Sequence, residues 1–280
     1  MPLARAKVNL WLNVVGRRAD GYHLLDSLVA FTDLADEIDV RAASDLSLEV
    51  AGPGAASLWD EADNLVLRAA RLLAGRSGLA PRAALRLTKH IPVAAGLGGG
   101  SADAAAALLA LVDLWRVAMP DEELFDLAAE LGADVPMCLA GRPALVAGVG
   151  ERLAPAPRLP PCAILLVNPG LPLPTPQVFA ARQGSFSAER PAPGGWPDLA
   201  TLGREIAARG NDLTDAAVSL RPEITSVLQA LRGSQGVVHA AMSGSGATCF
   251  GLYETVEAAR HAAATLPSFW WRHAGQLVAS

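Results

Sequence analysis

Apolar and polar residues alternate near the start of the chain, in RAKVNLWLNVVG, and this period of two predicts a β-strand. One face of the strand would carry Ala6, Val8, Leu10 and Leu12, and the other Lys7, Asn9, Trp11 and Asn13. An Asp20-Gly21 pair follows, which is a strong turn signal. Lys7 and Asn9 are therefore expected to share one face of the first strand.

The rest of the chain mixes strands and helices without a strict β-α-β order. Alternation and short apolar runs predict strands at 36–42, 46–52, 83–91, 143–153, 163–170, 236–244, 247–253 and 272–279, the first two short and antiparallel. Helical spacing predicts helices at 64–75, 102–115, 121–132, 199–209, 222–232 and 255–265. The prolines of LPLPTPQVF predict an extended segment, and residues 183–197 are predicted to form a loose surface loop. This mixture favours an α+β fold over a doubly wound sheet.

Composition and charge narrow the classes of protein. Hydrophobic residues make up 51% of the 280 residues, which is typical of a globular protein. The formal net charge of −5 gives no general attraction to nucleic acid or to an anionic membrane, so an anionic ligand needs a local positive site. Three widely spaced cysteines argue against a zinc site or a disulfide framework. Without a membrane-length apolar run or a signal-peptide-like start, we expect a cytoplasmic protein with neither a nucleic-acid nor a membrane partner.

The stretch with the strongest functional signal is PVAAGLGGGSA, residues 92–102, which leads from a predicted strand into an alanine-rich helix. Its four glycines let backbone N–H groups approach a ligand without obstruction by Cβ atoms. Ser101 is predicted to cap the helix, and the positive helix end then completes an anion site. Asp103 would repel a phosphate, so its carboxylate should point away from one.

Two common glycine motifs do not fit this loop. A Walker A loop requires a lysine directly after its last glycine, but Ser101 follows Gly100. A dinucleotide fingerprint, G-x-G-x-x-G, requires a third glycine where Ser101 stands. The remaining alternatives are a phosphate-binding loop and a tight strand-to-helix turn without a ligand, and the number of glycines favours the first.

PVAAGLGGGSA resembles the phosphate loop of the GHMP kinases, the superfamily of galactokinase, homoserine kinase and mevalonate kinase. Four further stretches are similar to motifs of that superfamily and occur in the same order: AKVNLWLNVVGRRADGYHLLDSL, LGADVPMCLAG, PTPQVF and GSGATCFGL. The similarity is greatest to the branch that acts on a cytidine diphosphate conjugate of methylerythritol, and it covers nearly the whole chain. The resemblance implies ATP-dependent phosphorylation of the C2 hydroxyl of the methylerythritol part, in non-mevalonate isoprenoid biosynthesis.

The resemblance also implies an α+β fold of two lobes with the active site in the cleft between them. A nucleotide lobe, ribosomal protein S5 domain 2-like, would comprise residues 1–152, completed by a C-terminal strand at about 274–280. A ferredoxin-like substrate lobe would comprise residues 153–273. LAPAPRLPPC, with four prolines in ten residues, supports a boundary near residue 153.

ATP is the implied phosphoryl donor, with Mg²⁺ to neutralise the triphosphate. The implied ATP-binding residues are Asn64, Pro92, Val93, Ala94, Ala95, Gly96, Leu97, Gly98, Gly99, Gly100, Ser101 and Ala102. Asn64 would lie near the adenine, although it also fits the cap of the helix that follows it. The protein ligand of magnesium is not readable from the sequence, and Ser101 is one candidate.

Lys7 and Asp134 are the candidate catalytic residues. Asp134 follows a predicted helix end and would accept the hydroxyl proton, although its spacing also fits a helix N-cap. Lys7 alone would be read as a solvated strand lysine. In the family the matching lysine pairs with the aspartate, which keeps the carboxylate ionised and offsets charge near the transferring group.

Five residues are implied to bind the substrate: Asn9, Tyr22, His23, Thr175 and Phe179. Tyr22 and His23 would recognise the cytidine end, with Phe179 stacked near the base. Without the resemblance they would be read as a core tyrosine and a surface histidine. Thr175 would lie near the substrate, and Asn9 would bond the substrate or Asp134. The glycines of SGSGATCF suggest a second backbone approach to the substrate, for which a plain hairpin turn is the alternative.

Two rival functions stay open. One is another GHMP kinase, acting on homoserine or a mevalonate derivative, against which Tyr22-His23 and PTPQVF argue. The other is a non-catalytic nucleotide-binding regulator, against which the retention of Lys7 and Asp134 argues. The oligomeric state is not readable from the sequence.

Overall fold

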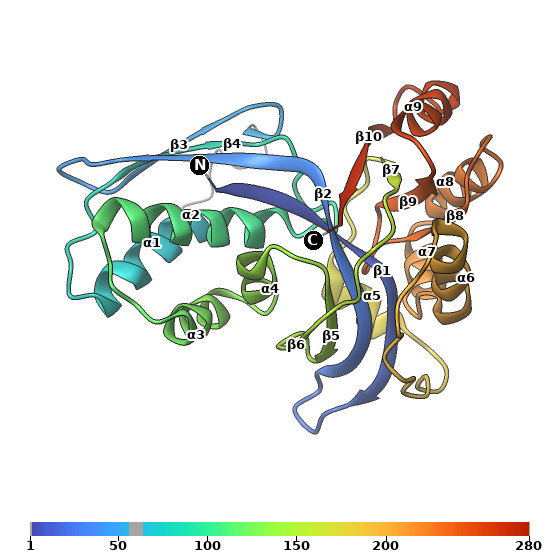
Figure 1. The fold of residues 1–280 in the computed structure, drawn as a ribbon, viewed down its shortest axis with the longest axis horizontal. Coiled ribbons are helices and arrows are strands. Elements are labelled where there is room, and N and C mark those ends of the chain that lie inside the picture. The colour runs from blue at the N-terminus through green and yellow to red at the C-terminus, as the bar shows by residue number, and fades with distance from the viewer. Residues whose placement is uncertain (1, 56–63, 280) are drawn as a thin grey trace. The chain divides into compact units, whose positions relative to one another are not determined.

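The computed structural model describes residues 2–55 and 64–279, and the chain divides into two compact units (Figure 1). Unit 1 comprises Met1–Lys7, Leu34–Val93 and Gly98–Gly141; unit 2 comprises Val8–Asp33, Ala94–Leu97 and Arg142–Ser280. The predicted lobes at 1–152 and 153–273 stay a prediction, since residues 8–33 and 94–97 group with the later part of the chain.

The sheet of unit 1 is formed by β3 (Ser47–Ala51), β4 (Ala84–Thr88) and the later part of β2 (His23–Arg41). β4 lies in the middle and pairs antiparallel with β2 and parallel with β3. The prediction of two short antiparallel strands was therefore wrong for β2, which has 19 residues, and for β3, which runs parallel to its neighbour. Two parallel neighbours need a connection that brings the chain back to the end of the sheet where the first strand began. A helix lies in this connection between β3 and β4.

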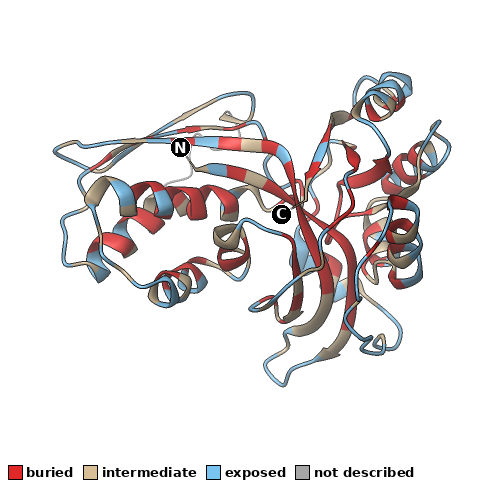
Figure 2. Ribbon diagram, in the orientation of Figure 1, coloured by how far each residue is buried: buried red, intermediate tan, exposed pale blue. Residues whose placement is uncertain are grey.

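The described residues of unit 1 form four helices: α1 (Leu65–Arg76), α2 (Gly99–Trp115), α3 (Asp121–Leu131) and α4 (Val135–Ala140). α2 contacts α1, α3 and α4, and its alanine-rich stretch is almost wholly buried (Figure 2). Small alanine side chains allow this close packing and favour a helix in any case. The core of unit 1 is therefore built around the helix that follows the glycine loop.

The larger sheet of unit 2 has the order β10 (Trp271–Val278), β7 (Ala163–Asn168), β9 (Cys249–Tyr253) and β8 (His239–Met242), with every pair antiparallel. The early part of β2 pairs with β10, with β1 (Leu3–Arg17) and with β5 (Ala144–Gly148), and β5 pairs with β6 (Arg152–Pro155). The predicted C-terminal strand is thus present, and it lies between β2 and β7.

The helices of unit 2 are α5 (Thr175–Ala181), α6 (Leu199–Arg209), α7 (Thr214–Leu220), α8 (Glu223–Arg232) and α9 (Val256–Thr265). The prediction that LPLPTPQVF is extended was wrong at its end, because α5 begins at Thr175 with a proline in its first turn, where proline is tolerated. α7 was not predicted from the sequence. No helix in the described part of the chain is long and apolar enough to cross a membrane.

Candidate active site

Lys7 and Asp134 form an ion pair in unit 1, as the resemblance implies. Lys7 Nζ lies 3.3 Å from Asp134 Oδ2, with side-chain exposures of 10% and 39%. The lysine reaches this position from β1, and the aspartate precedes α4. A nearly buried ammonium therefore faces a carboxylate that solvent or a ligand can reach.

Asp134 occupies the N-cap position of α4, but its side chain makes no capping hydrogen bond. The backbone completes the turn instead: Val135 N–H donates to the Gly132 carbonyl, and Cys138 N–H donates to the Asp134 carbonyl. The alternative role of the carboxylate as a helix cap is thereby wrong. Its oxygen faces Lys7.

The stem of Lys7 lies against the start of α2. Gly98 is the N-cap of α2 and has a φ of 67°. A Cβ built at Gly98 would lie 2.6 Å from Lys7 Cγ, so a side chain here would collide with the lysine as well as strain the backbone. The prediction that Ser101 caps this helix was wrong, because the helix begins at Gly99 and Ser101 lies within its first turn.

The earlier part of the glycine loop belongs to unit 2 and packs against a second glycine turn. A Cβ at Gly96, where φ is 76°, would lie 2.4 Å from the carbonyl oxygen of Gly246. The hydroxyl of Thr248 donates to the Ala95 carbonyl. Ala94 has a φ of 56°, an unfavourable value for a residue with a Cβ and one that is concentrated at functional sites. Both glycine motifs therefore require residues without side chains where their backbones come into contact.

A buried cluster in unit 1 was not predicted: Lys89, Asp36 and Asp103. Lys89 Nζ bonds Asp36 and lies 2.7 Å from Asp103 Oδ2. Asp36 Oδ1 also accepts the N–H groups of His90 and Ile91. A Cβ at Gly99 would lie 3.2 Å from Lys89 Nζ, which places this ammonium beside the first turn of α2. The carboxylate of Asp103 is thus turned into the unit, toward Lys89.

Burial and neighbouring charges shift the pKa values of Asp103 and Lys89. Burial raises the pKa of Asp103 to about 8; the Lys89 ammonium opposes this shift and the Asp36 carboxylate adds to it. Burial lowers the pKa of Lys89, but the two carboxylates outweigh it and leave that pKa raised. In the described residues, Asp103 Oδ1 is buried without a hydrogen-bond partner. At neutral pH a proton on Asp103 would remove the excess negative charge from this dry site.

Asn64 caps α1, and its side-chain oxygen accepts the N–H of Val66 at 2.9 Å. This is the alternative that the sequence left open for Asn64. A place near the adenine stays a prediction for this residue, as ATP contacts do for residues 92–102.

Asn9 and Thr175 both contact the second glycine turn in unit 2. The backbone N–H of Asn9 donates to the Ser243 hydroxyl at 3.1 Å, and its side-chain amide donates to Ser27 at 2.8 Å. The hydroxyls of Thr175 and Ser245 lie 2.8 Å apart. The turn therefore brings together two of the five predicted substrate residues.

His23 and Phe179 form a second pair in unit 2. Their ring centroids lie 5.0 Å apart and the ring planes differ by 25°. Burial, with help from Arg17 and Arg182, lowers the pKa of His23, so the imidazole is neutral near pH 7. Tyr22, which directly precedes His23 in the sequence, is exposed. An exposed aromatic ring and a neutral imidazole suit a flat, uncharged heterocycle.

Two stretches of the chain match models of one family. Residues 64–142 match the model described as GHMP kinases N terminal domain, and residues 194–270 match GHMP kinases C terminal. The chain belongs to the GHMP kinases, and the predicted family and α+β fold are confirmed.

Named relatives within that family are similar over the full chain. The chain is 53% identical to the 4-diphosphocytidyl-2-C-methyl-D-erythritol kinase of Paramagnetospirillum magneticum, across 98% of this chain and 97% of that protein. It is 51% identical to the protein of the same name from Rhodospirillum rubrum, across 98% and 91%. A crystal structure of 4-(cytidine 5'-diphospho)-2C-methyl-D-erythritol kinase is 40% identical and superposes with a TM-score of 0.82, covering 99% of both chains.

Proposed function

We propose that this protein transfers the γ-phosphoryl group of ATP to the C2 hydroxyl of 4-diphosphocytidyl-2-C-methyl-D-erythritol. The observation that carries the proposal is the 53% identity to a kinase of that name over nearly the whole chain. The Lys7–Asp134 pair beside the start of α2 supports it, because a kinase needs a proton acceptor close to its phosphate site. Kinases of this family use ATP.

In the proposed reaction the C2 oxygen forms a bond to the γ-phosphorus while the bond from that phosphorus to the bridging oxygen of ADP breaks. Asp134 takes the hydroxyl proton. Lys7 pairs with the Asp134 carboxylate and offsets negative charge that develops on the transferring group. Backbone N–H groups at residues 96–101 hold the phosphate oxygens. These roles rest on the ion pair and the bare backbone described above.

Mg²⁺ is part of the proposal as the ion that neutralises the triphosphate when ATP is bound. No cluster of three or more His, Cys, Asp or Glu side chains that could hold a metal lies within residues 2–55 and 64–279. Mg²⁺ in nucleotide sites is usually held by phosphate oxygens, water and only one or two protein groups. The hydroxyl of Ser101, in the first turn of α2, is the protein group we propose for it.

In unit 2, we assign Asn9 and Thr175 to the alcohol part of the substrate and Tyr22, His23 and Phe179 to its cytosine. The neutral imidazole of His23 can both donate and accept a hydrogen bond at the polar edge of the base. The rings of Tyr22 and Phe179 offer faces on which the base can stack.

The test is a phosphoryl-transfer assay with ATP and three alcohols: the cytidine-linked methylerythritol, mevalonate and homoserine. We expect turnover of the first alone. Asp134→Asn should lower kcat by about 10²–10⁴-fold and leave ATP binding unchanged, because general-base assistance contributes that much. Asp113→Asn, an exposed aspartate on α2, is the matched control and should keep wild-type kcat.

Turnover of mevalonate or homoserine instead would assign the protein to another branch of the family. ATP binding without transfer to any alcohol would identify a regulator. Normal turnover by Asp134→Asn would remove this residue from the mechanism.

A further inference from the structure

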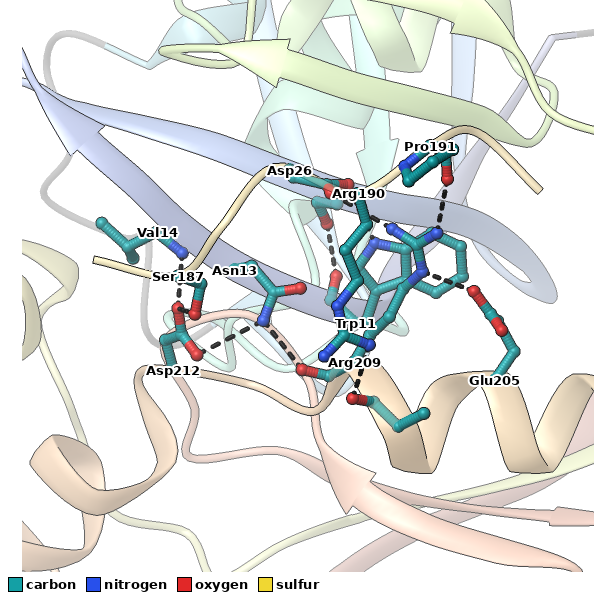
Figure 3. Close-up of polar contacts among 12 residues, drawn as sticks. Trp11, Asn13, Val14, Asp26, Ser187, Arg190, Pro191, Glu205, Arg209 and Asp212 are labelled. Atoms are coloured by element: carbon teal, nitrogen blue, oxygen red, sulfur yellow. Dashed lines mark hydrogen bonds and ion pairs between the residues drawn. The ribbon is translucent and has the colours of Figure 1, made fainter. Parts of the chain in front are cut away.

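The side chain of Arg209, at the end of α6, is buried among four segments of unit 2 (Figure 3). Its Nε donates to Glu205 Oε1 at 2.7 Å, its Nη1 to Asp26 Oδ2 at 3.1 Å, and its Nη2 to the Pro191 carbonyl at 2.8 Å. The guanidinium lies 4.5 Å from the ring centroid of Trp11. These residues, Arg209, Glu205, Asp26, Pro191 and Trp11, are called the Arg209 cluster below.

The members of the Arg209 cluster also bond one another. Trp11 Nε1 donates to Asp26 Oδ1 at 3.2 Å, so the Asp26 carboxylate joins the indole to the guanidinium. Trp11 is fully buried and meets Trp196 edge to face, with centroids 6.2 Å apart. Planar guanidinium groups suit such sites, since they offer several N–H donors in fixed directions and stack on aromatic rings.

A second set of contacts joins two of these segments, β1 and residues 182–198, to Asp212. Asp212 accepts hydrogen bonds from Val14 N–H at 2.7 Å, from the Ser187 hydroxyl at 2.7 Å and from Asn13 Nδ2 at 3.3 Å. Ser187 N–H donates to the Val14 carbonyl at 2.9 Å. Residues 182–198, which separate α5 from α6, are therefore bonded to β1 at Ser187 and to the Arg209 cluster at Pro191.

The segments joined in this way carry the residues that we assign to the cytosine. β2 begins at His23, directly after Tyr22, and Asp26 follows three residues later on the same strand. Phe179 lies on α5, directly before the 182–198 segment. The rings of His23 and Phe179 meet across this junction. His23 and Phe179, the two sides of the proposed base site, are thus close in space but 156 residues apart in the sequence. The Arg209 cluster joins the segments that follow them, β2 and residues 182–198.

We propose that Arg209 is a positioning residue that sets the distance between the Tyr22-His23 turn and Phe179, and so determines affinity for the cytidine end of the substrate. The inference rests on the proposed function. No atom of Arg209 needs to touch the substrate, because the guanidinium acts through Asp26 on β2 and through Pro191 on the 182–198 segment. The cytidine end does not take part in bond making, so a loosened base site weakens binding of the ground state and the transition state alike.

The test compares steady-state kinetics of Arg209→Lys and Arg209→Gln with wild type, using ATP and the cytidine-linked methylerythritol. Lysine keeps the charge but cannot bond Glu205, Asp26 and Pro191 together in one plane. We expect the KM for the cytidine-linked substrate to rise at least about tenfold in both variants, while kcat and the KM for ATP stay within about threefold. Arg204→Gln is the matched control, since Arg204 lies exposed on the same helix and bonds Thr201 within it.

Folding is followed by thermal melting of each variant. If Arg209→Gln does not fold, Arg209→Lys and Asp26→Asn carry the test, and each should show the same selective rise in KM. A lower Tm with unchanged KM, or an equal loss for ATP and for the cytidine-linked substrate, would overturn the inference and leave Arg209 a purely structural residue. Wild-type turnover of the cytidine-linked substrate keeps the proposed function in either case, whereas wild-type failure to turn it over would overturn both.

Discussion

Each unit of this protein buries a cation between two carboxylates, and the two arrangements differ in how dry they are. In unit 1, the side chain of Lys89 is 3% exposed, and the side chains of its partners Asp36 and Asp103 are 0% and 4% exposed. In unit 2, Arg209 is 4% exposed, but its partners Asp26 and Glu205 are 21% and 33% exposed. Both sets carry one more formal negative charge than positive charge. Only in unit 1 is that surplus shut away from water.

The difference follows from the shape and the hydrogen-bond donors of the two cations. A lysine ammonium is a compact charge, and in unit 1 it fills a closed site beside the first turn of α2. An arginine guanidinium is a wide, planar donor, and in unit 2 it bonds three segments and stacks on a fourth. We therefore expect unit 1 to depend on charge balance at its cluster, and unit 2 to depend on geometry.

The largest expected effect comes from removing the buried charge of unit 1. Lys89→Met would leave two carboxylates without their cation in a dry site, and loss of one partner of a buried pair costs about 3–5 kcal/mol. The free energy of unfolding, measured by urea denaturation, should fall by that amount. Arg76→Met, which breaks an exposed pair with Glu130, is the control and should cost less than about 1 kcal/mol. Similar losses in the two variants would show that burial does not set the strength of the Lys89 pair.

Asp103→Asn tests the charge balance of unit 1 through pH. Burial raises the pKa of Asp103 to about 8 in the folded protein, whereas the unfolded chain has the ordinary value near 3.8. Between these values the folded state holds a proton that the unfolded state has lost. The contribution of Asp103 to the free energy of unfolding is therefore greatest below pH 3.8 and decreases as pH rises toward 8.

Asparagine has no proton to lose, so the variant should gain stability relative to wild type as pH rises from about 4 to about 8, with no further gain above that. Urea denaturation at several pH values between 4 and 9 measures this difference. The groups that face Asp103 are Lys89, Asp36 and the Cys138 thiol, whose own pKa burial raises. A constant difference across this range would show that Asp103 is ionised throughout, and the contrast between the two clusters would then be wrong.

The sequence predicted most of the local structure, because apolar periodicity determines which face of an element is buried. The strand that carries Lys7, the helix after the glycine loop and α6 all follow from it. α5 did not, because its prolines favour extended structure unless they fall in a first helical turn, and the sequence does not reveal that placement. The predicted Ser101 cap was wrong for a related reason: Gly98, at φ 67°, already occupies the N-cap position, and a glycine has no side chain to indicate a cap.

The functional residues also divide into those that the sequence predicted and those that it did not. Lys7 and Asp134 were predicted from motifs of a family, and the structure brings them into contact. Lys89 and Asp36 were not predicted, because they lie 53 residues apart and each reads as an ordinary charge near the end or edge of a strand. Arg209 reads as a basic residue at a helix end, which is favourable by itself. Its contact with Asp26, 183 residues away, depends on the packing of the whole unit.

The smallest expected effect comes from the solvent-facing carboxylate of unit 2. Glu205 lies one helical turn before Arg209 and is a third exposed, so water already screens its charge. Glu205→Gln keeps an oxygen that can accept from Arg209 Nε and removes the surplus negative charge. We expect a loss of less than about 0.5 kcal/mol in the free energy of unfolding, by urea denaturation, because exposed i,i+4 pairs contribute about that much. A loss comparable to that of Lys89→Met would mean that a carboxylate open to water matters as much as the dry ones around Lys89, and exposure would no longer explain the difference between the two units.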